Sequence, residues 1–151
     1  MAWDFVGRSG IALANNPHVT ALRQKVKALR EEEKTVAKVI QAQYHSVINK
    51  AKLDEPQLGQ LRKELLAQER QYLLLTTDKE QKANIRRNYE HLRRVLGGEG
   101  LLDAGAIHQL REQETAHVRL VQTVYKAKIL ELEQGIQVAS KVNPTVKGRR
   151  R

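Results

Sequence analysis

Cysteine is absent from this chain, and aromatic residues are scarce. The lack of cysteine excludes a disulfide scaffold, a thiolate metal site and cysteine-based catalysis. Because aromatic residues make up only 4% of the 151 residues, leucine, valine, isoleucine and alanine must fill the interior of the fold. A chain of this length is sufficient for one domain.

Long apolar runs and secretion signals are also missing. The longest uninterrupted apolar run is four or five residues, so we expect no segment that spans a bilayer. The N-terminal sequence lacks a basic region followed by a long apolar stretch, so we expect no signal peptide. No glycosylation sequon is present, since Asn143 is followed by Pro144. These features favour an intracellular protein or a component of a virion.

The chain carries a formal net charge of +10. The excess of basic residues is largest in residues 1–53 and 101–151 and small in residues 54–100. A charge of this size favours anionic surroundings, such as nucleic acid, an anionic lipid surface or an acidic protein face. Composition alone does not distinguish these partners.

Three stretches of about forty residues each have the apolar spacing of amphipathic helices. We expect helices over residues 17–53, 55–96 and 104–142. Two breaks separate them, Asp54-Glu55-Pro56 and Gly97-Gly98-Glu99-Gly100. Asn16, Asp54 and Asp103 are suited to cap the helix starts, and Gln57 completes a capping box with Asp54.

The second of these helices has an ambiguous point near Thr77. The apolar pattern changes phase between Leu75 and Ile85, and Thr77 with Glu80 is able to form a new capping box. We expect a continuous helix with a local phase change, and a break at this point is the alternative. In the third helix, apolar residues repeat every eleven residues, which is typical of a nearly straight helix.

These features predict an all-α protein with three long helices. They form an antiparallel elongated bundle or a coiled-coil hairpin, between a short N-terminal segment and a basic C-terminal tail. Helices of similar length can cover one another's apolar stripes, and burial of such stripes supplies most helix stability in water. The domain organisation is then residues 1–16, 17–142 and 143–151. Leu66, Leu73 and Leu74 widen the apolar face of the second helix, which suggests a further partner helix.

Both chain ends contain candidate binding residues. Trp3, Phe5 and Val6 form either a cap over one end of the bundle or an anchor for a partner protein, since aromatic residues contribute strongly to interfaces. Asn143-Pro144 is expected to end the third helix. The tail beyond it is a candidate phosphate-binding arm or a solubilising end. Its basic residues are Lys147, Arg149, Arg150 and Arg151.

Four arginines on the second helix form the other candidate anion site, Arg86, Arg87, Arg93 and Arg94. Positions seven apart lie on nearly the same line of a helix, so these side chains make two adjacent rows that we expect to point outward. The rows form either a surface that follows phosphates or an ordinary solvated face.

Metal binding and catalysis find little support in the sequence. Glu114 and His117 have the spacing of a di-iron motif, but no second motif of this kind occurs. We interpret Glu114 as a polar interruption of the apolar stripe, and we place His117 off that line. No nucleophile elbow or phosphate-binding loop is present. We therefore expect no metal, no cofactor and no enzymatic activity.

Our leading hypothesis is a structural subunit of a nucleic-acid-containing assembly, such as a virion or a ribonucleoprotein particle. Its partners are other protein subunits, together with nucleic acid or another polyanion, and homo-oligomer formation remains open. The alternative is a helical adaptor that docks partner helices in a membrane-associated, secretion or respiratory complex.

Overall fold

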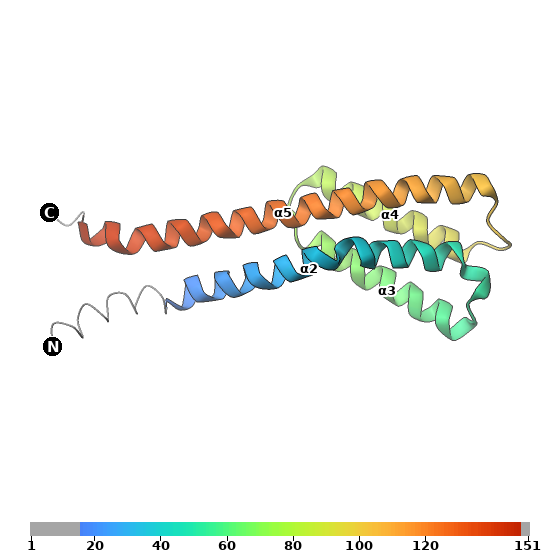
Figure 1. Cartoon of the computed structure of the whole chain (residues 1–151), viewed down its shortest axis with the longest axis horizontal. Helices are drawn as coiled ribbons and strands as arrows, with labels where there is room; N and C mark the ends of the chain where they lie inside the picture. Colours follow the sequence, from blue (N-terminus) through green and yellow to red (C-terminus); the bar gives the residue numbers. More distant parts are fainter. Residues whose placement is uncertain (1–15, 149–151) are drawn as a thin grey trace. The chain divides into compact units, whose positions relative to one another are not determined.

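The computed structural model describes the backbone of residues 16–148 and the side chains of residues 16–140. Within this range the chain forms four α-helices, one short 3-10 helix and no strand (Figure 1). The elements are α2 (Pro17–Ile48), η1 (Lys50–Lys52), α3 (Glu55–Leu73), α4 (Lys79–Gly97) and α5 (Ala104–Gly148). The all-helical prediction is confirmed, but the structure has four helices where the sequence analysis expects three.

The expected caps start three of the helices. Asn16 Oδ1 accepts hydrogen bonds from the backbone N–H groups of His18 (2.9 Å) and Val19 (3.2 Å). At the start of α3, Asp54 and Gln57 form the predicted capping box, with both bonds at 2.9 Å. Asp103 Oδ1 accepts from Ala106 N at 2.7 Å at the start of α5. Each cap satisfies N–H groups that have no partner inside the helix.

The prediction of one continuous helix over residues 55–96 is wrong. Asp78 caps a new helix by accepting from Gln81 N at 2.8 Å. Thr76 Oγ1 accepts from Asp78 N at 3.1 Å and donates to Gln81 Oε1 at 2.6 Å. These side chains offer the backbone an alternative to the helical hydrogen bonds. The change of apolar phase near Leu75 therefore marks a turn, after which α4 packs against α3.

Two helix ends differ from the predicted ones. α2 ends at Ile48, and the tight 3-10 turn η1 replaces its expected last residues. α5 continues through Asn143-Pro144 to Gly148, whereas its predicted end is at about residue 142. Proline costs a helix one backbone hydrogen bond, but its fixed φ near −65° is compatible with helical backbone. Residues 143–148 of the predicted tail are thus helical.

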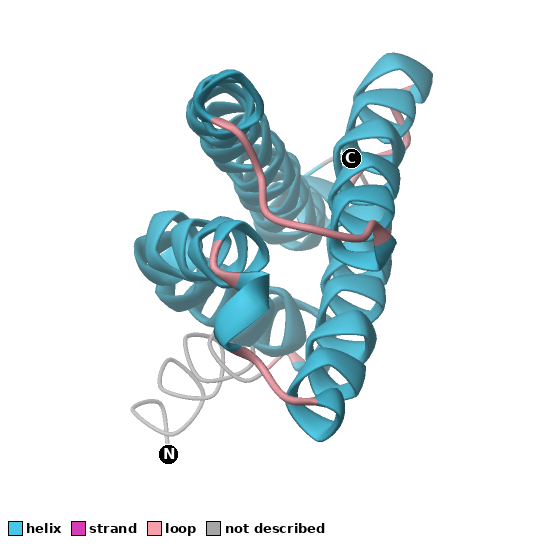
Figure 2. Ribbon diagram, turned by 90° about the vertical axis from the view of Figure 1, so that its right-hand side faces the viewer, coloured by secondary structure: helices cyan, strands magenta, loops and turns pink. Residues whose placement is uncertain are grey.

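Residues 33–126 form a four-helix bundle, which contains the second half of α2, η1, α3, α4 and the first half of α5. Figure 2 shows these helices end-on, with the connections to α3 and α5 at the near end. Each helix contributes one of the chain's four tyrosines to the buried core, and aliphatic side chains fill the layers between them. The tyrosines are Tyr44, Tyr72, Tyr89 and Tyr125, each at most 1% exposed.

Residues 16–32 of α2 and 127–148 of α5 form a second compact unit. Its two helices are antiparallel by connectivity, and an ion pair between Arg30 and Glu133 links them. A methyl group added at Gly135 would lie 3.7 Å from Leu22 Cδ1, which is an ordinary van der Waals distance, so the two helices pack against each other at this glycine. The buried apolar residues of this unit are Val19, Val26, Leu29, Ile129 and Leu132.

Replacing Gly59 with alanine should stabilise the protein. Gly59 lies within α3, and no atom lies within 4 Å of the position of an added Cβ. Alanine is favoured over glycine in a helix by about 0.5–1 kcal/mol, so the free energy of unfolding should rise by about that amount. Urea unfolding measures it. Gly100→Ala is the control, because Gly100 has φ +81° and alanine there should lower stability. A destabilised Gly59→Ala protein would contradict the prediction.

Candidate functional site

The helix α4 separates apolar and basic side chains cleanly. Its buried residues recur at spacings of three and four and face the bundle core: Ile85, Tyr89, Leu92 and Leu96. Basic side chains lie outside this buried stripe, interspersed with Glu80 and Glu90, and we call these basic residues the cationic face of α4. Its exposed or half-exposed members are Lys79, Lys82, Arg86, Arg87 and Arg94.

The helix α4 as a whole carries the charge excess of the bundle. Residues 33–126 hold sixteen lysines and arginines and twelve acidic residues, a net charge of four. α4 alone holds six basic and two acidic residues, also a net charge of four. The remainder of the bundle is therefore neutral in formal charge, with ten residues of each sign. A concentrated charge of this kind attracts anions more strongly than the same charge spread evenly.

Arg93 does not belong to this outward-pointing set, which corrects the prediction for one of the four arginines. Its Nη1 lies 2.5 Å from Oε1 of Glu69, which belongs to α3. The Glu69 side chain is only 9% exposed and that of Arg93 is 31% exposed. A nearly buried carboxylate needs a partner, and Arg93 supplies it. Arg93 thus holds α4 against α3.

The other three arginines remain accessible. Arg86, Arg87 and Arg94 are exposed, as the seven-residue spacing predicted. Arg87 donates to Asn84 Oδ1 at 2.8 Å, within α4. Arg86 and Arg94 take part in none of the ion pairs found among the described side chains. Their guanidinium groups are free to meet an anion, although binding itself stays a prediction.

The other predicted binding residues lie outside the described side chains. Trp3, Phe5 and Val6 precede the first described residue. Lys147 falls within α5, but only its backbone is described, and Arg149 to Arg151 follow the last described residue.

A buried polar network occupies the centre of the bundle. Gln113 Nε2 donates to Tyr44 Oη at 2.9 Å, and Tyr44 Oη lies 2.9 Å from His117 Nδ1. Which of these two atoms donates depends on the tautomer of the imidazole. Nε2 is buried without a hydrogen-bond partner. Burial lowers the pKa of His117 from 6.5 to about 4.

Aromatic rings surround this histidine. The imidazole meets Tyr89 edge-to-face, with ring centroids 4.8 Å apart, and meets Tyr44 in the same way at 5.6 Å. Burial raises the pKa of both tyrosines above the ordinary value of 10. Tyr89 Oη donates to Gln43 Oε1 at 3.2 Å. These groups are neutral at physiological pH and serve to fix how the four helices pack.

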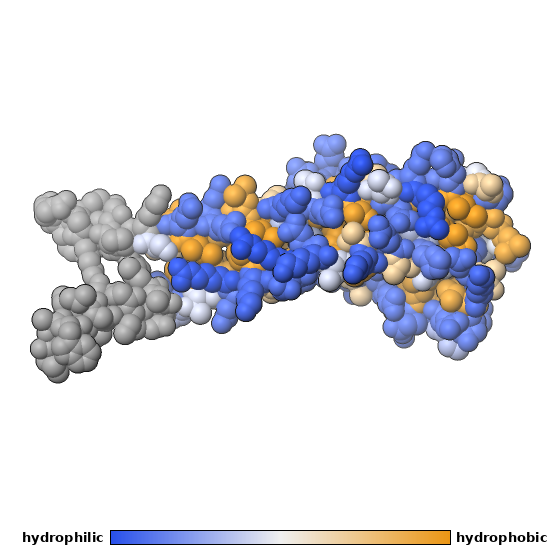
Figure 3. All heavy atoms as spheres, viewed as in Figure 1, coloured by the Kyte–Doolittle hydropathy of each residue, from blue (hydrophilic) through white to orange (hydrophobic). Residues whose placement is uncertain are grey.

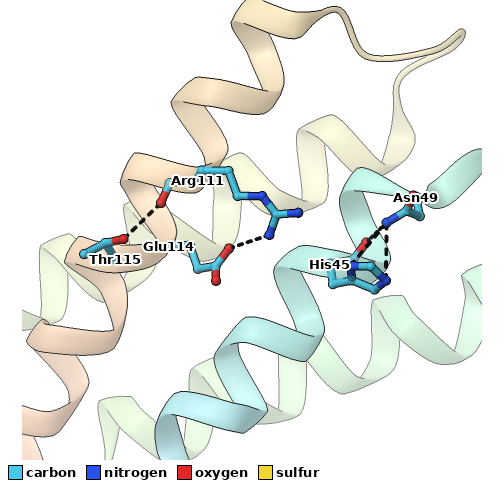
Figure 4. A network of polar contacts seen from close by, with 5 residues as sticks. All are labelled: His45, Asn49, Arg111, Glu114 and Thr115. Atoms are coloured by element: carbon cyan, nitrogen blue, oxygen red, sulfur yellow. Dashed lines mark hydrogen bonds and ion pairs between the residues drawn. The ribbon is translucent and has the colours of Figure 1, made fainter.

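The prediction that His117 lies off the apolar line of α5 is wrong. His117 is 0% exposed, whereas the Glu114 side chain is 13% exposed and pairs with Arg111 on its own helix at 3.2 Å (Figure 4). The core line of α5 passes through Leu110, His117 and Val121, at spacings of seven and four. This spacing was the signal in the sequence that could have placed His117 in the core. It was missed because His117 is polar and only apolar residues were assigned to the core.

The described residues contain no group of three or more histidine, cysteine, aspartate or glutamate side chains placed to hold a metal ion. Among them, no helix is both long and apolar enough to cross a membrane. Comparisons with known proteins by family model, by sequence and by structure found no match.

Proposed function

We propose that the chain is a non-enzymatic structural subunit of a nucleic-acid-containing assembly, such as a virion or a ribonucleoprotein particle. In this proposal the cationic face of α4 meets phosphate groups, and apolar helix surfaces meet other protein subunits. The observation that carries the proposal is the location of the charge: the positive excess of an otherwise neutral bundle belongs to one helix, α4, and five of its six basic side chains are exposed or half-exposed.

Guanidinium groups suit this role. Each presents several N–H donors in a planar fork that matches phosphate oxygens. Arg87 and Arg94 lie seven residues apart on the outer side of α4, and Arg86 lies beside them. We therefore expect contacts with the sugar-phosphate backbone, which carry no sequence information directly. The basic tail, Lys147 and Arg149 to Arg151, would add to the same interaction.

A triple substitution tests the proposal. Changing Arg86, Arg87 and Arg94 to glutamine should weaken binding of a labelled single-stranded oligonucleotide by about tenfold or more near physiological salt. It should also flatten the dependence of affinity on salt, by up to about 0.7 in log–log slope for each lost phosphate contact. Fluorescence anisotropy at several salt concentrations measures both effects on the full chain.

A second triple variant removes the same charge elsewhere. Arg23, Lys25 and Lys27 are exposed on α2, outside the bundle. Their replacement by glutamine changes the net charge equally, so a specific role of α4 requires a clearly smaller effect here. Equal losses in the two variants would mean that only net charge matters, and the proposal for α4 would fail.

The second candidate is a helical adaptor, and exposed leucines favour it. Leu66 is 41% exposed on α3, and Leu74 is 84% exposed just after this helix. Arg62, Lys63 and Arg70 are exposed on the same helix, so an acidic amphipathic helix would suit this surface. A pull-down before and after nuclease treatment separates the candidates, because nuclease-resistant partners support the adaptor and nuclease-sensitive ones support the first proposal.

A further inference from the structure

A hollow opens at the end of the bundle where η1 meets the loop between α4 and α5. Its cavity volume is about 360 Å³. Four leucines line it together with Lys50: Leu53, Leu58, Leu96 and Leu101. Figure 3 shows apolar side chains gathered at this end of the bundle. The volume lies at the lower end of the range of about 300–1,000 Å³ that is typical of small-molecule sites.

Lys50 is the one charged residue that lines this hollow. It is only 8% exposed, and its Nζ donates to the backbone oxygens of Val95 and Gly98, each at 2.6 Å. These contacts satisfy carbonyl groups at the C-terminal end of α4, where a cation is favoured.

The charge of Lys50 is nevertheless not matched by an anion. An ammonium group has three N–H donors, and the two carbonyl contacts use two of them. Neither contact is with a carboxylate, and Lys50 forms none of the ion pairs found among the described side chains. Buried charges in proteins are usually paired, because removing them from water costs free energy. The site thus combines an unmatched cation, one remaining donor and apolar walls.

We propose that this hollow binds an aliphatic carboxylate of medium chain length. The carboxylate accepts the remaining N–H of Lys50, and the hydrocarbon chain packs against the four leucines. A phosphate group fits less well, because one donor does not satisfy its several oxygens and the leucines offer no others. The chemistry therefore matches a small fatty acid and not a nucleic acid backbone.

Binding of octanoate to the full chain tests this inference by isothermal titration calorimetry. Octanol has the same chain without the charge, and octylamine carries the opposite charge. We expect octanoate to bind at least tenfold more tightly than either of them. No measurable binding of octanoate, or equal binding of octanoate and octanol, would overturn the proposal.

Two glutamate substitutions at equally exposed leucines locate the site. Leu101 and Leu74 are both 84% exposed, but only Leu101 lines the hollow. Leu101→Glu removes an apolar wall and adds a repulsive charge, so octanoate affinity should fall at least tenfold. Leu74→Glu should leave it unchanged, and neither change should disturb folding. Equal effects of the two substitutions would place octanoate elsewhere and refute the assignment.

Lys50→Met tests the role of the cation directly. This variant should bind octanoate no better than octanol, and circular dichroism checks that it is folded. Should it fail to fold, the comparison of octanoate with octanol and the pair of leucine variants still decide the question. The outcome is independent of the proposed nucleic-acid binding, because Arg86, Arg87 and Arg94 do not line this hollow.

Discussion

Replacing Arg93 with alanine should lower the free energy of unfolding by about 3 kcal/mol. The substitution leaves Glu69, whose side chain is only 9% exposed, without the guanidinium that lies 2.5 Å from its carboxylate. Removing one partner of a buried ion pair typically costs about 3–5 kcal/mol. We take the lower end of that range because the Arg93 side chain is 31% exposed, which screens the pair. Urea unfolding measures the change.

Arg94→Ala is the matched control for this prediction. Arg94 is the next residue of α4, but it is exposed and takes part in none of the described ion pairs. Its replacement should change stability by no more than about 0.5 kcal/mol. The double variant Glu69→Leu with Arg93→Leu should recover most of the loss, since apolar residues can replace a buried ion pair at little cost. Similar losses for Arg93→Ala and Arg94→Ala would show that Glu69 needs no partner.

Acid should destabilise the protein through His117 by an amount on the order of 3 kcal/mol. In the unfolded chain its imidazole has the ordinary pKa of 6.5, whereas burial lowers the pKa to about 4 in the folded state. Above pH 6.5 the imidazole is neutral in both states. Between these two values the unfolded chain binds a proton that the folded chain excludes, so stability falls as the pH falls. The full difference between the two pKa values corresponds to the stated free energy.

Comparing stability at pH 7 and pH 4.5 in several variants isolates this contribution. His117→Gln removes the titrating group, so the loss of stability between these pH values should shrink by most of the predicted amount. His108→Gln is the control, because the His108 side chain is 74% exposed. The unsubstituted protein and both variants contain the same carboxylates, so these groups contribute equally to the pH dependence of stability in all three. An unchanged pH dependence in His117→Gln would assign the acid sensitivity to other groups.

The capping residues and breaks show how much of the fold was predictable. Asn16, Asp54 with Gln57, and Asp103 act within three residues of their own positions. Their effect does not depend on which helices pack together, so local sequence was sufficient. The same holds for the glycine-rich break, where α4 ends at Gly97 and Gly100 has a positive φ.

The turn between α3 and α4 was harder to predict because two local signals competed. The apolar pattern allowed a continuous helix with a phase change, and Thr77 with Glu80 allowed a new capping box. The cap that forms is Asp78, one residue later. Packing of α4 back onto α3 decided in favour of the turn, because only the folded-back arrangement buries Tyr72 and Tyr89 in one core. Tertiary burial therefore outweighed the continuity of the helical pattern.

In the candidate site, too, some features were predictable from the sequence and others were not. Exposure of Arg86, Arg87 and Arg94 followed from their helical spacing, whereas the pairing of Arg93 with Glu69 joins residues 24 positions apart. His117 and Lys50 likewise find their partners on other helices, 73 and 45 positions away. The sequence by itself determined the helical class, the helix starts and the apolar faces, because these depend on neighbours within one or two turns. Only the tertiary structure decided which polar groups are buried and paired, because that depends on which helix faces meet.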